Sequence, residues 1–146
     1  MSNYLLDDIR DYLTNDLKYV NVQIMWASSN PNNTKNINDN QILLQDEGAG
    51  EIPIGEYNWW ESVSIYVRNV NRETANVISK NIMYKLQGFQ GFLTTSNTPV
   101  FIQQIRVVTP PTWYSSANNL TEILTRFKIL IRDPNLNQKT TSKIII

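Results

Sequence analysis

The sequence predicts an α+β domain in which two helices pack on one face of a mixed, mainly antiparallel sheet of about five strands. Apolar residues recur at every second position in four segments and form a short consecutive run in a fifth, as in strands, and they recur at every third or fourth position in two others, as in amphipathic helices. The predicted order is helix, three strands, helix, two strands. Two helices are too few to cover both faces of such a sheet, so we expect them on one face.

The chain has 146 residues, the size of one domain. We expect residues 1–133 to form this domain and residues 134–146 to be a tail that becomes ordered in an assembly. The sequence contains no cysteine and no histidine, which excludes disulfides, thiol nucleophiles, the usual zinc sites and the commonest general base. No apolar run approaches the roughly 18 residues that span a bilayer, and no signal peptide is visible, so we expect a cytosolic origin.

The first predicted helix covers residues 4–18. Its apolar residues lie on one face, and its carboxylates, at Asp7, Asp8, Asp11 and Asp16, lie elsewhere and are expected to be solvated. Asp7 and Asp8 do not suggest a metal or acid/base pair, because adjacent helical side chains point about 100° apart.

A half-buried strand is expected over residues 19–26, followed by a long exposed loop over residues 27–40. Three consecutive apolar residues, Ile42 to Leu44, predict a short strand over residues 41–45 that is buried on both sides. Residues 46–58 read as a loop rich in glycine and acids. Its spacing fits neither a phosphate-binding motif nor a calcium-binding loop.

The central unit, Trp60 to Gly88, is a strand followed directly by a helix. Val63, Ile65 and Val67 alternate with Ser62, Ser64, Tyr66 and Arg68, so the first set is expected to face the core and the second to face outward. In the helix, Asn71 is a predicted N-cap and Gly88 a predicted end. Its apolar stripe consists of Ala75, Ile78, Ile82 and Leu86. Trp59 and Trp60 must point to opposite faces, so at most one joins the core.

Two more strands are predicted, over residues 100–109 and 122–132. Pro110 and Pro111 are expected to end the first, and a polar loop carrying Trp113 and Tyr114 follows. In the second, Ile123, Phe127, Ile129 and Ile131 are expected to face inward and Glu122, Arg126, Lys128 and Arg132 outward. The chain ends in three β-prone isoleucines, Ile144, Ile145 and Ile146.

Charge is unevenly distributed along a chain whose formal net charge is zero. Through Glu61 there are ten acids and three bases, and after it three acids and ten bases. Two interpretations remain open. The fold can separate the two sets into surfaces of opposite sign that suit head-to-tail self-association, or it can interleave them into a mixed surface.

The central unit also carries a family resemblance. The run Asp39-Asn40-Gln41-Ile42 leads into Leu44, Asp46 and Gly48, then a loop with glycine and proline, then Val63-Ser64-Ile65-Tyr66-Val67-Arg68 and the helix that ends at Leu86-Gln87-Gly88. An extended strand, a polar loop with proline and a last strand with an arginine at its end follow. Over residues 39–132 this pattern resembles the tail terminator and minor capsid proteins of long-tailed bacteriophages. The Trp59-Trp60 pair and the tail after Asp133 depart from it.

The resemblance implies a structural virion protein and not an enzyme. Such proteins form a ring, usually of six copies, that caps the tail tube, stops its polymerisation and offers a docking surface to the head-completion or connector protein. Double-stranded DNA passes through the lumen without specific binding, as net neutrality allows. The protein would be assembled in the cytoplasm of the host bacterium and reside at the tail or neck of the virion, without cofactor, metal or membrane.

Candidate contact residues, for the neighbouring subunit or the tube, are Trp59, Trp60, Tyr66, Arg68 and Trp113. Arg68 has an equal alternative, an ion pair with an acid on the next strand. Ile144, Ile145 and Ile146 are either a frayed terminus or a segment that docks on another subunit's sheet edge. Two other functions remain open: another neck component, such as a head-completion or stopper protein, and a monomeric module that binds a small ligand or peptide. No catalytic, cofactor or metal residue is predicted, since no nucleophile stands in a recognisable arrangement with a base.

Overall fold

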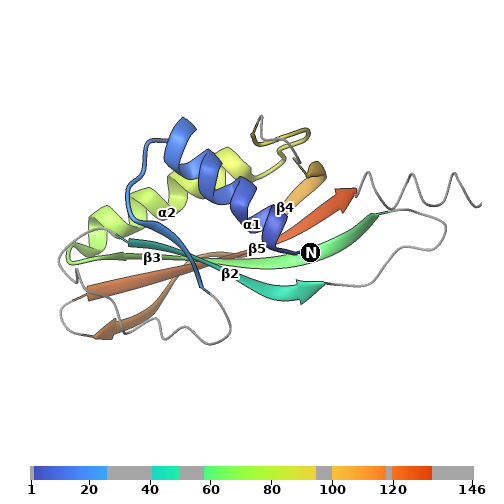
Figure 1. Ribbon diagram of the computed structural model, residues 1–146. Coiled ribbons are helices and arrows are strands. Elements are labelled where there is room, and N and C mark those ends of the chain that lie inside the picture. The colour runs from blue at the N-terminus through green and yellow to red at the C-terminus, as the bar shows by residue number, and fades with distance from the viewer. Residues whose placement is uncertain (1, 26–40, 50–57, 95–99, 118–119, 133–146) are drawn as a thin grey trace, which may run out of the picture.

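The computed structural model describes residues 2–25, 41–49, 58–94, 100–117 and 120–132 (Figure 1). Two helices and five strands lie in these residues, and α1 is extended by a π-helical turn, Tyr12–Asp16. The elements are α1 Ser2–Asp11, β1 Val22–Met25, β2 Gln41–Ala49, β3 Asn58–Asn69, α2 Arg72–Leu86, β4 Phe101–Ala117 and β5 Leu120–Arg132.

The five strands form one sheet in the order β1-β2-β3-β5-β4. Only β1 and β2 pair in parallel, and the other neighbours are antiparallel. Both helices lie on the same side of the sheet, with α1 beside the β1–β2 edge and α2 over β3 and β5 (Figure 1). The predicted α+β class, with a mixed sheet and two helices on one face, is therefore confirmed.

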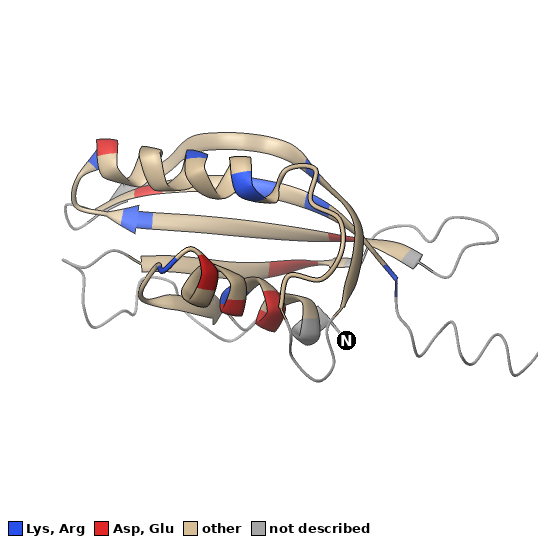
Figure 2. Cartoon of the chain, turned by 90° about the horizontal axis from the view of Figure 1, so that it is seen from above, with Lys and Arg blue, Asp and Glu red and all other residues tan. Residues whose placement is uncertain are grey.

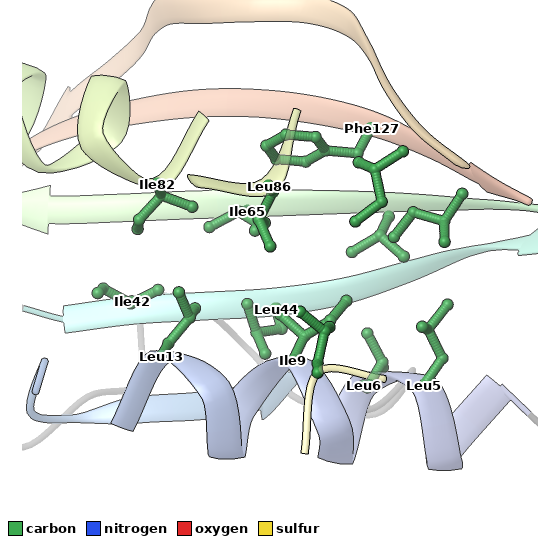
Figure 3. Packing of buried hydrophobic residues seen from close by; sticks show 14 of the residues in the cluster. Leu5, Leu6, Ile9, Leu13, Ile42, Leu44, Ile65, Ile82, Leu86 and Phe127 are labelled. Atoms are coloured by element: carbon green, nitrogen blue, oxygen red, sulfur yellow. The ribbon is translucent and has the colours of Figure 1, made fainter. Parts of the chain in front are cut away.

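The main core fills the space between the two helices and the sheet. Leu5, Leu6 and Ile9 of α1 and Leu13 of the π-helical turn face Ile42 and Leu44 of β2, whereas Ile82 and Leu86 of α2 lie near Ile65 and Phe127 (Figure 3). Val63, Ile65 and Val67 of β3 are each about 1% exposed, and Phe127 and Ile129 of β5 are buried beside them. The inward positions predicted for these two strands are therefore correct.

Local signals at both ends of α2 act as the sequence predicts. The Asn71 side chain accepts a hydrogen bond from the Thr74 N–H at 3.1 Å, as an N-cap does. After Leu86 the chain leaves the helix through Gly88, whose φ of 79° suits glycine. The Gly88 N–H then donates to the Ile105 carbonyl on β4 at 3.0 Å, which ties this end of α2 to the edge of the sheet.

One predicted solvated acid is in fact buried. Asp8 is 3% exposed and accepts hydrogen bonds from the Val100 N–H at 2.8 Å and the Thr94 hydroxyl at 3.5 Å. Burial raises the pKa of this carboxyl, although the two hydrogen bonds oppose the rise. The expectation of a solvated carboxylate fails because Thr94 and Val100 lie against this side of α1, which helix periodicity alone does not reveal.

Three strand ends differ from the predicted ones by three residues or more. β1 begins only at Val22, because Lys18 and Asn21 adopt positive φ angles of 64° and 56° and turn the chain between helix and strand. β2 continues to Ala49 through a register shift at Gly48, whose φ is 109°. β4 does not stop at Pro110-Pro111 but continues to Ala117.

The two prolines are tolerated because β4 lies at the edge of the sheet, with β5 as its neighbouring strand and a separate bridge to Gly91 at Ile102, away from the prolines. The register shifts between Thr109 and Thr112, so the prolines sit in an irregularity that needs no ladder donor. The predicted loop over residues 27–40, residues 50–57 of the loop predicted over residues 46–58 and the predicted tail over residues 134–146 lie outside the described residues.

Because one face of α2 is buried and the other is exposed, shortening a side chain on each face should change the free energy of unfolding by different amounts. Ile82→Ala, at a residue that is 1% exposed, should lower the free energy of unfolding by about 2–5 kcal/mol, because it leaves a cavity against the sheet. Val77→Ala, at a residue that is 61% exposed, is the matched control and should change it by less than about 0.5 kcal/mol. Urea unfolding measures both, and equal effects would contradict the packing described.

Candidate interaction surfaces

The side of the sheet opposite the helices, called the distal face below, holds most of the predicted contact residues. Because side chains alternate along a strand, Trp60, Ser62, Ser64, Tyr66 and Arg68 of β3 all belong to this face. Strand register aligns them with residues of β2, β5 and β4 in rows that run across the sheet. The rows differ in chemistry from one end of the face to the other.

The row that contains Tyr66 is a small apolar cluster. Leu43, Tyr66 and Leu124 are directly opposite one another on β2, β3 and β5, and Met25 packs against them. The Tyr66 hydroxyl donates to Gln45 Oε1 at 3.2 Å, and its ring meets the Tyr114 ring edge-on at 5.4 Å. Tyr66 is only 8% exposed, so it lies on the expected face but is buried.

The neighbouring row contains a buried ion pair. Arg68 of β3 and Glu122 of β5 are direct cross-strand partners, and Arg68 Nε forms a salt bridge with Glu122 Oε2. Their side chains are 6% and 9% exposed. Arg68 was predicted either to contact another protein or to form an ion pair with an acid on the next strand, and the structure shows the ion pair. Both residues of the pair lie on the outward face that the sequence predicts, but they are buried there, because each is covered by its partner and by neighbouring side chains. A contact of Arg68 or Tyr66 with another protein stays a prediction.

Trp59 and Trp60 point to opposite faces, as predicted. Trp59 packs against the main core, and its Nε1–H donates to Glu61 Oε1 at 2.9 Å. Trp60 lies half-buried on the distal face, where the Arg106 guanidinium and the Lys128 ammonium lie 5.6 and 5.4 Å from its ring centroid. Trp60 is therefore the centre of a cationic cluster. Sequence periodicity cannot identify Arg106 as its neighbour, because the register of three strands brings the two together.

Glu61 is a second buried acid on the helix-covered face, 3% exposed. Burial raises its pKa, the hydrogen bond from Trp59 lowers it, and the nearby Asp46 carboxyl raises it again. Asp46 is placed by the β2 irregularity, where its side chain accepts the Gly48 N–H at 2.8 Å. The two carboxyls connect β2 to β3 but show no catalytic arrangement with a nucleophile.

Of the other predicted contact residues, Trp113 is exposed, and the three C-terminal isoleucines lie outside the described residues. Trp113 is 53% exposed on the edge strand β4, and the adjacent Tyr114 is 55% exposed. Exposed aromatic side chains of this size are typical anchors of protein interfaces. Ile144, Ile145 and Ile146 lie outside the described residues, so their docking stays a prediction.

Charge is separated across the fold. Carboxylates gather on α1, and most lysines and arginines lie on α2 and the strands beneath and beside it (Figure 2). Asp7, Asp11 and Asp16, called the acidic edge below, belong to α1 and its π-helical turn at the β1–β2 side. Arg106, Arg126, Lys128 and Arg132 lie on β4 and β5 at the other side. Of the two interpretations of the uneven charge, the described residues favour separated surfaces.

Within the described part of the chain, no group of three or more acidic side chains could hold a metal ion. A shallow depression at the start of α2 is lined by Asn71, Glu73, Thr74, Val77 and Ile78, and Glu73 is its only titratable residue. No described helix is long and apolar enough to cross a bilayer.

Comparison with known proteins finds likeness in structure. No protein-family model matches the sequence, and no curated protein is significantly similar to it. The fold is similar to that of a chain from the virion of a native gene transfer agent particle, with a TM-score of 0.63 and 12% sequence identity. The match covers 89% of this chain and 96% of that chain, so the two share the fold over almost their whole lengths.

The buried ion pair predicts an asymmetric response to mutation. Arg68→Met alone should destabilise the protein by about 3–5 kcal/mol, because it leaves the Glu122 carboxylate buried without its partner. The double variant Arg68→Met/Glu122→Leu should lose much less, since no charge remains buried. Chemical denaturation of the two single variants and the double variant measures the coupling. Additive losses would contradict a specific pair.

Burial of Glu61 predicts a pH-dependent effect. Because the pKa of Glu61 is raised in the folded state, its contribution to stability is present at low pH and is lost as pH rises from about 4.5 through the folded pKa. Glu61→Gln keeps an oxygen that can accept the Trp59 N–H but cannot ionise. The variant should therefore be more stable than the wild type at neutral pH, with the difference shrinking toward pH 4. Melting temperatures across this range provide the measurement, and a pH-independent difference would contradict it.

Proposed function

We propose that this chain is a structural virion protein of a phage-like particle and, within that class, a tail terminator. It would form a ring that caps the tail tube, stop the tube's polymerisation and provide the docking surface for the head connector. The observation that carries this proposal is the fold, which matches a chain of a gene transfer agent virion over nearly the full length of both. The sequence resemblance to tail terminator and minor capsid proteins over residues 39–132 supports the narrower role.

The arrangement of charge supports assembly into a ring. A closed ring of identical subunits needs a heterologous interface, in which one side of a subunit meets a different side of the next. The acidic edge lies beside β1 and β2, whereas the cations of β4 and β5 lie at the other end of the strand order. Opposite charges at opposite ends of one sheet suit such head-to-tail contacts.

The partners follow from the role. They are other copies of this chain, in a ring of six, the tail tube protein and the head-completion or connector protein. Double-stranded DNA would pass through the lumen, and a chain of zero formal net charge is consistent with passage without tight binding. The protein would be assembled in the host cytoplasm and remain at the neck of the virion, acting without cofactor and not as an enzyme. Docking of Ile144 to Ile146 on a neighbouring sheet edge belongs to this proposal.

A genetic experiment separates this role from that of another neck component. Particles produced after deletion of the gene for this protein should have tails of irregular and excess length, because nothing then stops the tube from growing. Electron microscopy of lysates measures the length distribution, and complementation with the wild-type chain is the control. Tails of normal length that fail to join heads would assign the protein to the connector side of the neck instead.

A further inference from the structure

Three cations on the distal face have no acidic partner among the described residues. Arg106 and Lys128 are direct cross-strand partners on β4 and β5, and both lie against the Trp60 ring. Arg132 is exposed on the same face of β5. Like charges directly opposite each other destabilise a sheet. The cluster formed by Trp60, Arg106, Lys128 and Arg132, called the cationic cluster below, is therefore unfavourable in the isolated subunit.

The acids nearest to this cluster along the distal face are already engaged. Glu122 pairs with Arg68, and Glu47 lies 3.4 Å from the Arg126 guanidinium. Ser62 lies in the same row of the sheet as Lys128 and Arg106, and Leu130 and Gln104 lie in the same row as Trp60. These three neighbours are all neutral. Within the described residues, the contacts of Arg106 and Lys128 with the Trp60 ring stabilise two of the cations, but no acidic side chain neutralises the cluster.

The acidic edge has the complementary excess. Asp7 and Asp11 share one cation, Arg10, at 3.2 and 3.7 Å, and all three side chains are about 40% exposed. Asp16 is exposed and forms no ion pair within the described residues. The acidic edge belongs to the helix-covered side near β1 and β2, whereas the cationic cluster lies on the distal face at β3, β5 and β4. One subunit therefore cannot bring its own two surfaces together.

We infer that the cationic cluster is the docking surface for the acidic edge of a second copy of this chain. The inference rests on the proposed ring and names the surfaces that meet in it. Arginine pairs well with carboxylates, and a tryptophan between cations supplies a large apolar contact of the kind found at interface centres. The chain as a whole has as many acidic as basic residues, so an excess of one sign on one surface is offset by the opposite sign elsewhere on the chain, as suits a protein that binds itself.

A nucleic-acid occupant fits these observations less well. Proteins that hold DNA or RNA present an excess of basic residues, whereas this chain has as many acids as bases. Aromatic residues in single-strand binding sites offer a free ring face to a base. The Trp60 ring already lies against two cations, so a base would have to displace one of them.

A charge-swap experiment tests the inference. Lys128→Glu should weaken self-association about tenfold and weaken it less at high salt, where the attraction that it removes is screened. Mixing this variant with Asp16→Lys should restore association, because each altered surface then meets an opposite charge on the other variant. Sedimentation velocity over a concentration series, at low and high salt, measures both effects, with unchanged melting temperatures as the test of folding.

Lys80→Glu is the matched control, since it makes the same charge change at an exposed residue of α2 that belongs to neither the cationic cluster nor the acidic edge. It should not weaken association. Three results would overturn the inference: equal weakening by the two lysine variants, no rescue in the mixture, or a wild-type chain that stays monomeric at high concentration. Lys128→Glu that associates normally but no longer retains duplex DNA would indicate a nucleic-acid surface instead. A failed swap combined with overlong tails in the deletion would leave the terminator role intact.

Discussion

The packing of α1 and α2 against one face of a five-stranded sheet determines which side chains remain available for contacts. The strict alternation along β3 and β5 sends Val63, Ile65 and Phe127 into the core and leaves Trp60, Tyr66 and Lys128 on the distal face. No described helix covers that face. Its polar and aromatic side chains can therefore differ in chemistry from row to row without affecting the apolar core between the helices and the sheet.

The distal face is divided along the strands into a closed end and an open end. At the closed end, Arg68 and Glu122 pair with each other, and Leu43, Tyr66 and Leu124 pack against one another, all within the subunit. At the open end, Arg106 and Lys128 lie against the Trp60 ring, and Arg132 lies farther along the same face of β5. None of these three cations has an acidic partner in the described residues. The buried pair requires both of its partners, whereas the exposed cations beside a tryptophan are the surface that we propose for recognition. On this proposal, one face of the sheet contains both an internal contact and a docking surface.

The strand order explains how a small neutral chain can have two surfaces of opposite sign. The acid-rich first part of the sequence forms α1, β1 and β2 at one side of the sheet, and the basic last part forms β5 and β4 at the other. Because β5 inserts between β3 and β4, its cations lie beside Trp60 instead of at the outer edge. The resulting asymmetry suits a structural protein that assembles head to tail, which is the role we propose.

The sequence by itself determined the α+β class, the helix-covered face of β3 and β5, the Asn71 cap and the Gly88 end of α2, because these depend on periodicity and local conformation. Tertiary structure alone decided the burial of Asp8 and Tyr66, the partner of Arg68, the passage of β4 through Pro110-Pro111 and the placement of Arg106 against Trp60. Each of these depends on which strands become neighbours and in what register. Register brings together residues distant in the chain, and no local pattern encodes it.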